Sequence, residues 1–191
     1  MQLEWDEHFF EIVLPAWQDY LSAADELAAA AQDVNEARQK NASYKALRFG
    51  SSSALFLHHF ADIVLRARPP FLPKAVRNIA DLQTWLAGYC TSLRTGGPIG
   101  DVALLGDVAD ALKHAVLTRR LALRDIAAND AVLVVAIGFA ELRFSEGNYG
   151  GTDRVVVRAN SGARALSAVL QNVIDAWRRA ADMPLPDVGE A

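Results

Sequence analysis

The chain has 191 residues, of which 52% are hydrophobic and 22% charged, and its formal net charge is -4. This composition is typical of one folded domain, excludes a disordered chain, and argues against broad electrostatic capture of nucleic acid. The single cysteine, Cys90, excludes an intramolecular disulfide and suits a reducing compartment. The acidic N-terminus does not resemble a signal peptide, and the longest apolar run, residues 131–140, is half as long as a membrane-spanning helix. We therefore expect a cytoplasmic protein that does not enter a membrane.

Residues 4–40 show helical periodicity, in which Pro15 either kinks the segment or lies in the first turn of its longer part. The expected buried stripe consists of Trp17, Tyr20, Leu21, Ala24, Leu27, Ala28, Ala31 and Val34. A second helix is expected over residues 43–68, where two prolines end it, and a third over residues 74–93. Because residues 54–65 are apolar almost all round, the second helix is expected to be the most buried.

Residues 101–120, DVALLGDVADALKHAVLTRR, form an uninterrupted helical pattern with Asp101 as the expected N-cap. Its apolar face contains Leu105, Val108, Leu112, Ala115 and Val116, and its polar stripe contains Asp107, Asp110, His114 and Thr118. Asp110 and His114 are four residues apart, so the carboxylate can accept a hydrogen bond from the imidazole one turn later. A solvated helix face with a weak ion pair also explains the stripe, and we favour this interpretation because such faces are usually exposed.

A second polar stripe of the same spacing lies on the apolar helix, where His59, Asp62 and Arg66 occupy positions i, i+3 and i+7. Unpaired polar groups are costly to bury, so we expect the two stripes to face and satisfy each other across a helix pair. The second stripe is thus predicted to be a buried polar network. Such a network can fix the register of two helices without any further function.

The periodicity changes after Arg120. The apolar run at 131, the turn-rich EGNYGGTD and the β-branched RVVVRA predict a β-hairpin over residues 131–159. In it, Arg154, Val156 and Arg158 are expected on one face and Val155 and Val157 on the other. An isolated hairpin is marginal in water, so it must pack on the helices or pair with another subunit, which favours a homodimer.

A closing helix is predicted over residues 162–182, capped by Asn160 or Ser161. Its expected buried stripe consists of Leu166, Val169, Leu170, Val173, Ile174 and Trp177. The predicted fold is mainly α: a single domain, 1–191, in which a bundle of four to five long helices (4–122) is followed by the β-hairpin, the closing helix and a flexible tail (183–191).

The sequence contains no established metal motif. It has neither H-E-x-x-H nor paired E-x-x-H nor CxxC, and four polar residues on two helices (His59, Asp62, Asp110 and His114) are weak grounds for a mixed site. We therefore predict neither a metal nor a cofactor. The sequence also lacks G-x-S-x-G, so no serine nucleophile is predicted.

The segment ADALKHAVLTRR, the hairpin EGNYGGTDRVVVR and the closing helix ALSAVLQNVIDAW together resemble a group of uncharacterised proteobacterial helical proteins. The helical part also resembles HEPN-type bundles, in which a lysine-histidine step on a late helix is common. The resemblance covers roughly residues 43–180. Nuclease members of the HEPN group carry R-x(4-6)-H, and no histidine of this chain follows an arginine at that spacing. The resemblance therefore implies a non-catalytic, dimer-forming bundle.

Three functions follow from these patterns. The first is a non-catalytic helical interaction or scaffold protein, homodimeric, acting through the hairpin or the polar helix face. The second is a small hydrolase or nuclease in which His114 is the acid or base, Asp110 orients it, and Arg119 or Arg120 holds an anion. The third is nucleic-acid or phosphate binding by Arg119, Arg120 and Arg124, joined by the hairpin arginines; these cations would also be stabilised locally at a helix C-terminus.

Overall fold

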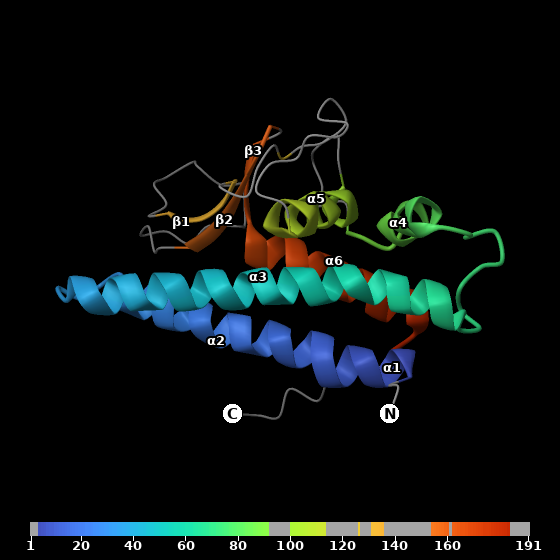
Figure 1. Cartoon of the computed structure of the whole chain (residues 1–191), viewed down its shortest axis with the longest axis horizontal. Helices are drawn as coiled ribbons and strands as arrows, with labels where there is room; N and C mark the ends of the chain where they lie inside the picture. Colours follow the sequence, from blue (N-terminus) through green and yellow to red (C-terminus); the bar gives the residue numbers. More distant parts are fainter. Residues whose placement is uncertain are drawn as a thin grey trace.

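The computed structural model describes residues 4–91, 100–113, 126, 131–135, 154–160 and 162–183. In these residues the chain is mainly α, as the sequence predicts, with a small antiparallel sheet before the last helix (Figure 1). The helices are α1 (Trp5–His8), the π-helix η1 (Phe9–Val13), α2 (Leu14–Ala30), α3 (Glu36–Ala67), α4 (Ile79–Ala87), α5 (Asp101–Lys113) and α6 (Leu166–Ala181). The strands are β1 (Val132–Val135), β2 (Arg154–Ala159) and β3 (Gly162–Ala165).

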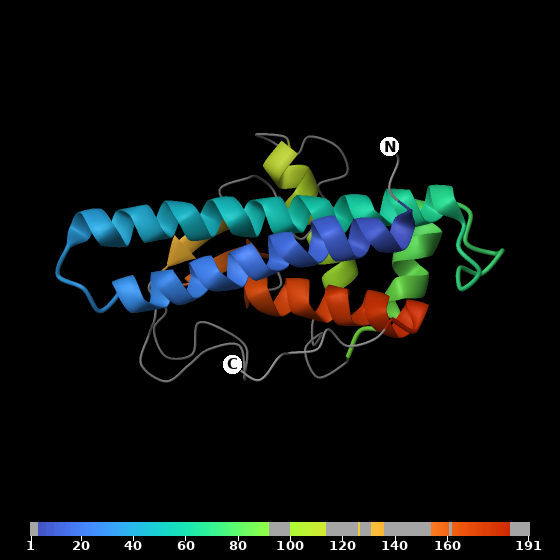
Figure 2. The ribbon, with the colours of Figure 1, turned by 90° about the horizontal axis from the view of Figure 1, so that it is seen from below.

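Two long antiparallel helices, α2 and α3, lie side by side along the longest axis of the molecule (Figures 1 and 2). Helix α6 packs against α3 on its inner side, α4 and α5 lie across α3 and α6, and the sheet contacts α2, α3 and α6. In the part of the chain described here, no helix has both the length and the apolar composition required to cross a bilayer.

The N-terminal helical segment ends earlier than its periodicity predicts. Helix α2 stops at Ala30, and Val34, which is 99% exposed, lies in the turn to α3 instead of the buried stripe. The next helix then begins early: the Asn35 side chain accepts a hydrogen bond from the Arg38 backbone N–H at 3.2 Å and caps α3, which starts seven residues before the predicted position. Pro15 lies in the first turn of α2, the second of the two expected placements.

Helix α3 ends where the sequence predicts, whereas α4 is shorter than predicted at both ends. At the predicted proline stop, α3 ends through Arg68, which adopts a left-handed conformation with φ 52°. Helix α4 has nine residues, fewer than the segment 74–93 predicts, and begins when the Asn78 side chain accepts from the Asp81 backbone N–H at 3.0 Å.

The sheet has the order β1-β2-β3 and is antiparallel throughout. The predicted pairing of β1 with β2 is confirmed, with Val132 opposite Val157. Residues 162–165 were expected to begin the closing helix but form β3, which places Arg158 opposite Ala163. The helix cap is therefore Ala165, which makes no side-chain capping bond, and not Asn160. Val156 is buried along with Val155 and Val157, so the face on which Arg154, Val156 and Arg158 are expected is also covered at the middle of β2.

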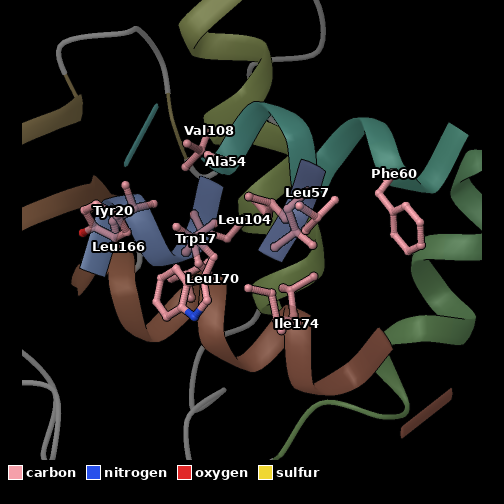
Figure 3. Packing of buried hydrophobic residues seen from close by; sticks show 14 of the residues in the cluster. Trp17, Tyr20, Ala54, Leu57, Phe60, Leu104, Val108, Leu166, Leu170 and Ile174 are labelled. Atoms are coloured by element: carbon pink, nitrogen blue, oxygen red, sulfur yellow. The ribbon is translucent and has the colours of Figure 1, made fainter. Parts of the chain in front are cut away.

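The core lies where α2, α3, α5 and α6 meet (Figure 3). All six residues of the predicted stripe on α6 are buried, as expected. In the predicted stripe of α2, Leu21 is exposed, whereas Trp17, Tyr20 and Leu27 are buried. At Gly50 of α3 a Cβ atom would lie 3.0 Å from both the Tyr20 ring and the Leu166 side chain, so the absence of a side chain allows this close approach.

Candidate functional site

The predicted polar stripe of α5 is only partly described. Asp107 and Asp110 are half-buried, and each makes an interaction within the molecule. His114, Arg119, Arg120 and Arg124 lie outside the described residues. The pairing of Asp110 with His114, and the hydrolase and anion-binding functions that depend on these residues, therefore stay predictions.

The predicted buried network of His59, Asp62 and Arg66 is wrong. All three residues are exposed on the outer side of α3. His59 Nδ1 lies 3.5 Å from Asp62 Oδ2, with 49% and 58% of the two side chains exposed. The spacing of the stripe is helical, but α3 is rotated so that Leu57, Ala61 and Val64 face the core instead.

The histidine of α3 that meets α5 is His58, about 100° round the helix from His59. A Cβ added to Gly106 of α5 would lie 3.7 Å from the His58 ring, an ordinary van der Waals distance, so the ring packs beside this residue of α5. Burial lowers the pKa of His58 below its ordinary value, and the Lys113 ammonium lowers it further; the Asp110 carboxylate partly offsets them. The neutral imidazole is therefore favoured here.

A small pocket adjoins His58 between α3, α4, α5 and α6. Its lining is mostly apolar, with Gln83 as the other polar side chain besides His58. Its volume of about 10 Å³ is roughly the space of one water molecule. It cannot hold a metabolite in this conformation, because ligand pockets are typically hundreds of cubic ångströms.

The strongest polar interactions of the core lie elsewhere, in a cluster formed by Asp101, Arg164, Asn172 and Thr91 that the sequence analysis missed. Arg164 of β3 binds the Asp101 carboxylate with both guanidinium nitrogens, Nη1 to Oδ1 at 2.5 Å and Nη2 to Oδ2 at 3.2 Å. Both side chains are at most 1% exposed. A bidentate pair of this kind fixes orientation as well as distance.

Asn172 of α6 joins this ion pair to the end of the α4 region. Its amide donates to Asp101 Oδ2 at 2.7 Å, and its Oδ1 accepts from the Thr91 backbone N–H at 3.0 Å and from the Thr91 hydroxyl at 3.1 Å. One side chain of α6 therefore binds both Thr91, which follows α4, and Asp101, the first residue of α5. Asp101 lies in this helix and is not the N-cap before it, and its carboxylate binds Arg164 and Asn172.

Two sequence signals could have indicated the cluster. Asn172 interrupts the apolar stripe of α6 three residues after Val169, where a buried amide needs partners. Arg164 lies between two alanines, Ala163 and Ala165, a setting with no local charge partner. Neither signal identifies Asp101, because 63 residues separate it from Arg164.

The only cysteine lies next to this cluster. Burial raises the pKa of Cys90 to about 11; the Asp101 carboxylate contributes in the same direction, whereas the Arg179 guanidinium opposes it. Cys90 is therefore a thiol at neutral pH.

The outer side of the α2–α3 pair forms an exposed surface of mixed character, which we call the α2–α3 face. An ion pair between Glu26 and Lys45, Nζ to Oε1 at 2.6 Å, crosses the seam between the helices on this side. Residues three, four and seven apart share one side of a helix. The face therefore comprises Asp19, Ser22, Asp25 and Glu26 of α2 and Lys45, Arg48, Ser52, Phe56 and His59 of α3.

Most of the large exposed hydrophobic side chains lie on the N-terminal helices, although only Phe56 belongs to the α2–α3 face itself. In the described residues the large exposed ones are Phe10, Leu21, Val34, Tyr44, Phe56 and Tyr89. All but Tyr89 belong to η1, α2, α3 or the turn between α2 and α3. Aromatic residues on a charged surface are typical of protein interfaces.

Within the described ranges, no group of three His, Cys, Asp or Glu side chains is arranged to hold a metal ion. Comparison with known proteins adds no relative: no family model, curated protein or solved structure matches the chain.

Proposed function

We propose that this chain is a cytoplasmic, non-catalytic interaction protein that acts as a homodimer. The observation that carries the proposal is the concentration of exposed hydrophobic side chains on η1, α2 and α3. Tyr44 and Phe56 are 64% and 42% exposed on a helix whose opposite side is fully packed. Burying them against a partner would recover hydrophobic free energy of roughly 1.5–3 kcal/mol for each fully buried side chain.

The interior supports a non-catalytic role. The polar groups of the Asp101 cluster bind one another in the core and are withdrawn from solvent. The pocket beside His58 has the size of one water molecule, too small for a substrate. A fixed polar cluster inside the fold suits a rigid scaffold, because rigid partners lose less conformational entropy on binding.

The HEPN resemblance agrees with this proposal, since it implies a dimer-forming bundle without nuclease activity. The absence of the R-x(4-6)-H spacing, a property of the sequence, supports the same conclusion.

Sedimentation equilibrium of the purified chain tests the proposal. At low micromolar concentration and moderate salt we expect a mass twice that of the chain, in reversible exchange with the monomer on dilution. A chain that keeps the monomer mass up to about 100 µM, where even a dimer as weak as Kd ~10 µM is mostly associated, would contradict it.

A further inference from the structure

We infer that the α2–α3 face is a self-complementary interface that binds the same face of a second copy. The two-fold axis runs parallel to the helices, so α2 of each protomer lies antiparallel against α3 of its partner. This inference rests on the proposed function and names the surface that performs it.

Charge is divided between the two helices of this face. Nine acidic residues and no lysine or arginine precede Arg38 in the sequence, so the side chains of α1, η1 and α2 carry only negative formal charge. Helix α3 carries five basic and two acidic residues. The face therefore consists of a negative strip beside a positive strip.

A two-fold rotation parallel to the helices places each strip of one copy against the opposite strip of the other. An isologous interface requires this kind of self-complementarity. A rotation that placed α3 against α3 would instead bring Arg48 and the other cations of the two copies together, at a cost in like-charge repulsion.

The contact between Glu26 and Lys45 within one chain sets the expected register. Rotation about an axis parallel to the helices changes no height along them, so Glu26 of one copy is also level with Lys45 of the other. Arg48, three residues further along α3, is then level with the turn Ser22–Glu26 of the antiparallel partner helix.

Several of these charges are available for a partner. In the described part of the chain, Asp19, Asp25 and Arg48 form no ion pair, and all three are exposed. The Arg48 guanidinium lies 4.8 Å from the ring of Phe49 on its own helix, which leaves its outer nitrogens for a carboxylate.

The face also has the apolar and small side chains that close helix packing requires. Phe56 follows Lys45 by three helical turns and therefore lies on the same side of α3. Ser22 and Ser52 are small, so they allow the two copies to approach closely. Phe56 supplies a central apolar contact, while the charged strips fix which helix it meets.

A charge-swap experiment tests this arrangement. Variant A reverses the α2 strip (Asp25→Arg with Glu26→Arg), and variant B reverses the α3 strip (Lys45→Glu with Arg48→Glu). A matched control, Lys74→Glu with Arg77→Glu, makes the same charge change as variant B at exposed positions after α3. Dimer dissociation constants are measured by sedimentation in 50 mM NaCl, and circular dichroism checks that each variant is folded.

Variant A alone and variant B alone should each dimerise at least tenfold more weakly than the wild type, because every cross-copy contact becomes repulsive. An equimolar mixture of A and B should form heterodimers within about threefold of the wild-type affinity, since both strips are again opposite in sign. The control should stay within about threefold of the wild type. No loss of folding in A or B could produce such mutual rescue.

Two results overturn the inference in distinguishable ways. If the wild type is a dimer but A and B dimerise as tightly as it does, or their mixture is not rescued, the interface lies elsewhere and the proposed homodimer stands. If the wild type is a monomer at every concentration, the homodimer itself is refuted, and the α2–α3 face is left for a protein of different sequence.

Discussion

Removing the guanidinium of Arg164 is the sharpest perturbation of the core. Arg164→Met keeps the length of the side chain and leaves the Asp101 carboxylate, which is 0% exposed, with the Asn172 amide as its remaining bond among those described above. Breaking a buried ion pair in this way costs about 3–5 kcal/mol. In a chain of 191 residues, a loss of about 1 kcal/mol lowers Tm by roughly 2–4 °C. The expected fall in Tm is therefore roughly 6–20 °C.

Urea unfolding followed by circular dichroism at pH 7 measures this loss as a change in the free energy of unfolding. Arg158→Met is the matched control, since Arg158 lies on the adjacent strand and is exposed; we expect it to change stability by less than about 0.5 kcal/mol. The double variant Asp101→Leu with Arg164→Met removes both charges and should be more stable than Arg164→Met alone, because no unpaired charge remains buried.

Two outcomes would refute this reasoning. One is a cost for Arg164→Met that equals the cost for Arg158→Met. The other is a double variant whose loss in free energy of unfolding equals the sum of the losses measured for Arg164→Met and for Asp101→Leu alone, which would mean that the two charges do not interact. If Arg164→Met does not fold, Arg164→Lys, which keeps the charge but loses the bidentate contact, should unfold at a urea concentration below that of the wild type.

Three further predictions concern two helix glycines, the histidine His58 and the cysteine Cys90. Gly50→Ala should destabilise the protein by about 1–2 kcal/mol, because its Cβ would meet the buried Tyr20 ring. Gly106→Ala should stabilise it by up to about 1 kcal/mol, because alanine favours a helix and the Gln83 side chain can move aside. Thermal unfolding measures both variants, and equal effects would contradict the difference in packing at the two glycines. The pKa of His58 is lowered in the folded state, so as the pH falls the unfolded chain protonates this imidazole before the folded chain does, and the free energy of unfolding should decrease below about pH 6.5. Urea unfolding midpoints measured between pH 5 and 7.5 should decrease less in His58→Gln than in the wild type. An identical decrease in both proteins would exclude His58 as the cause. With its pKa raised to about 11, Cys90 should be a thiolate in roughly one molecule in a thousand at pH 8. A disulfide reagent should therefore label Cys90 slowly in buffer and rapidly in urea. Equal labelling rates in buffer and in urea would show that the fold does not shield the thiol.

The sequence predicted those elements whose hydrophobic pattern is sustained. The closing helix is the clearest case: its apolar spacing identified six buried residues because α6 packs one continuous stripe into the core. The pairing of β1 with β2 was also predictable, since runs of valine around a turn favour adjacent strands. These signals are local, because each depends on the order of residues within a short stretch of the chain.

Elements created by their neighbours were not predictable in this way. The segment Gly162–Ala165 contains no strand-favouring residue and becomes β3 because β2 offers it an edge to pair with. The end of α2 depends on the capping turn around Asn35, which overrides an apolar pattern that continues to Val34.

The candidate site shows the same division. Matched spacing placed His59, Asp62 and Arg66 on one side of α3, but spacing does not specify the rotation of a helix about its own axis, and that side faces outward. The pairing of Arg164 with Asp101 joins residues far apart in the sequence, so only the folded chain reveals it. The acidic character of residues 1–37 was visible, but its position beside a basic helix follows from the packing of α2 on α3.

Self-association is the central claim, and the mass of the wild-type chain in solution tests it most directly. Light scattering coupled to size exclusion, in 50 mM and in 500 mM NaCl, should give a dimer at low salt whose population falls at high salt, because screening weakens the charged strips while Phe56 still contributes. A monomer at both salt concentrations would contradict the account of this protein as a homodimeric interaction protein.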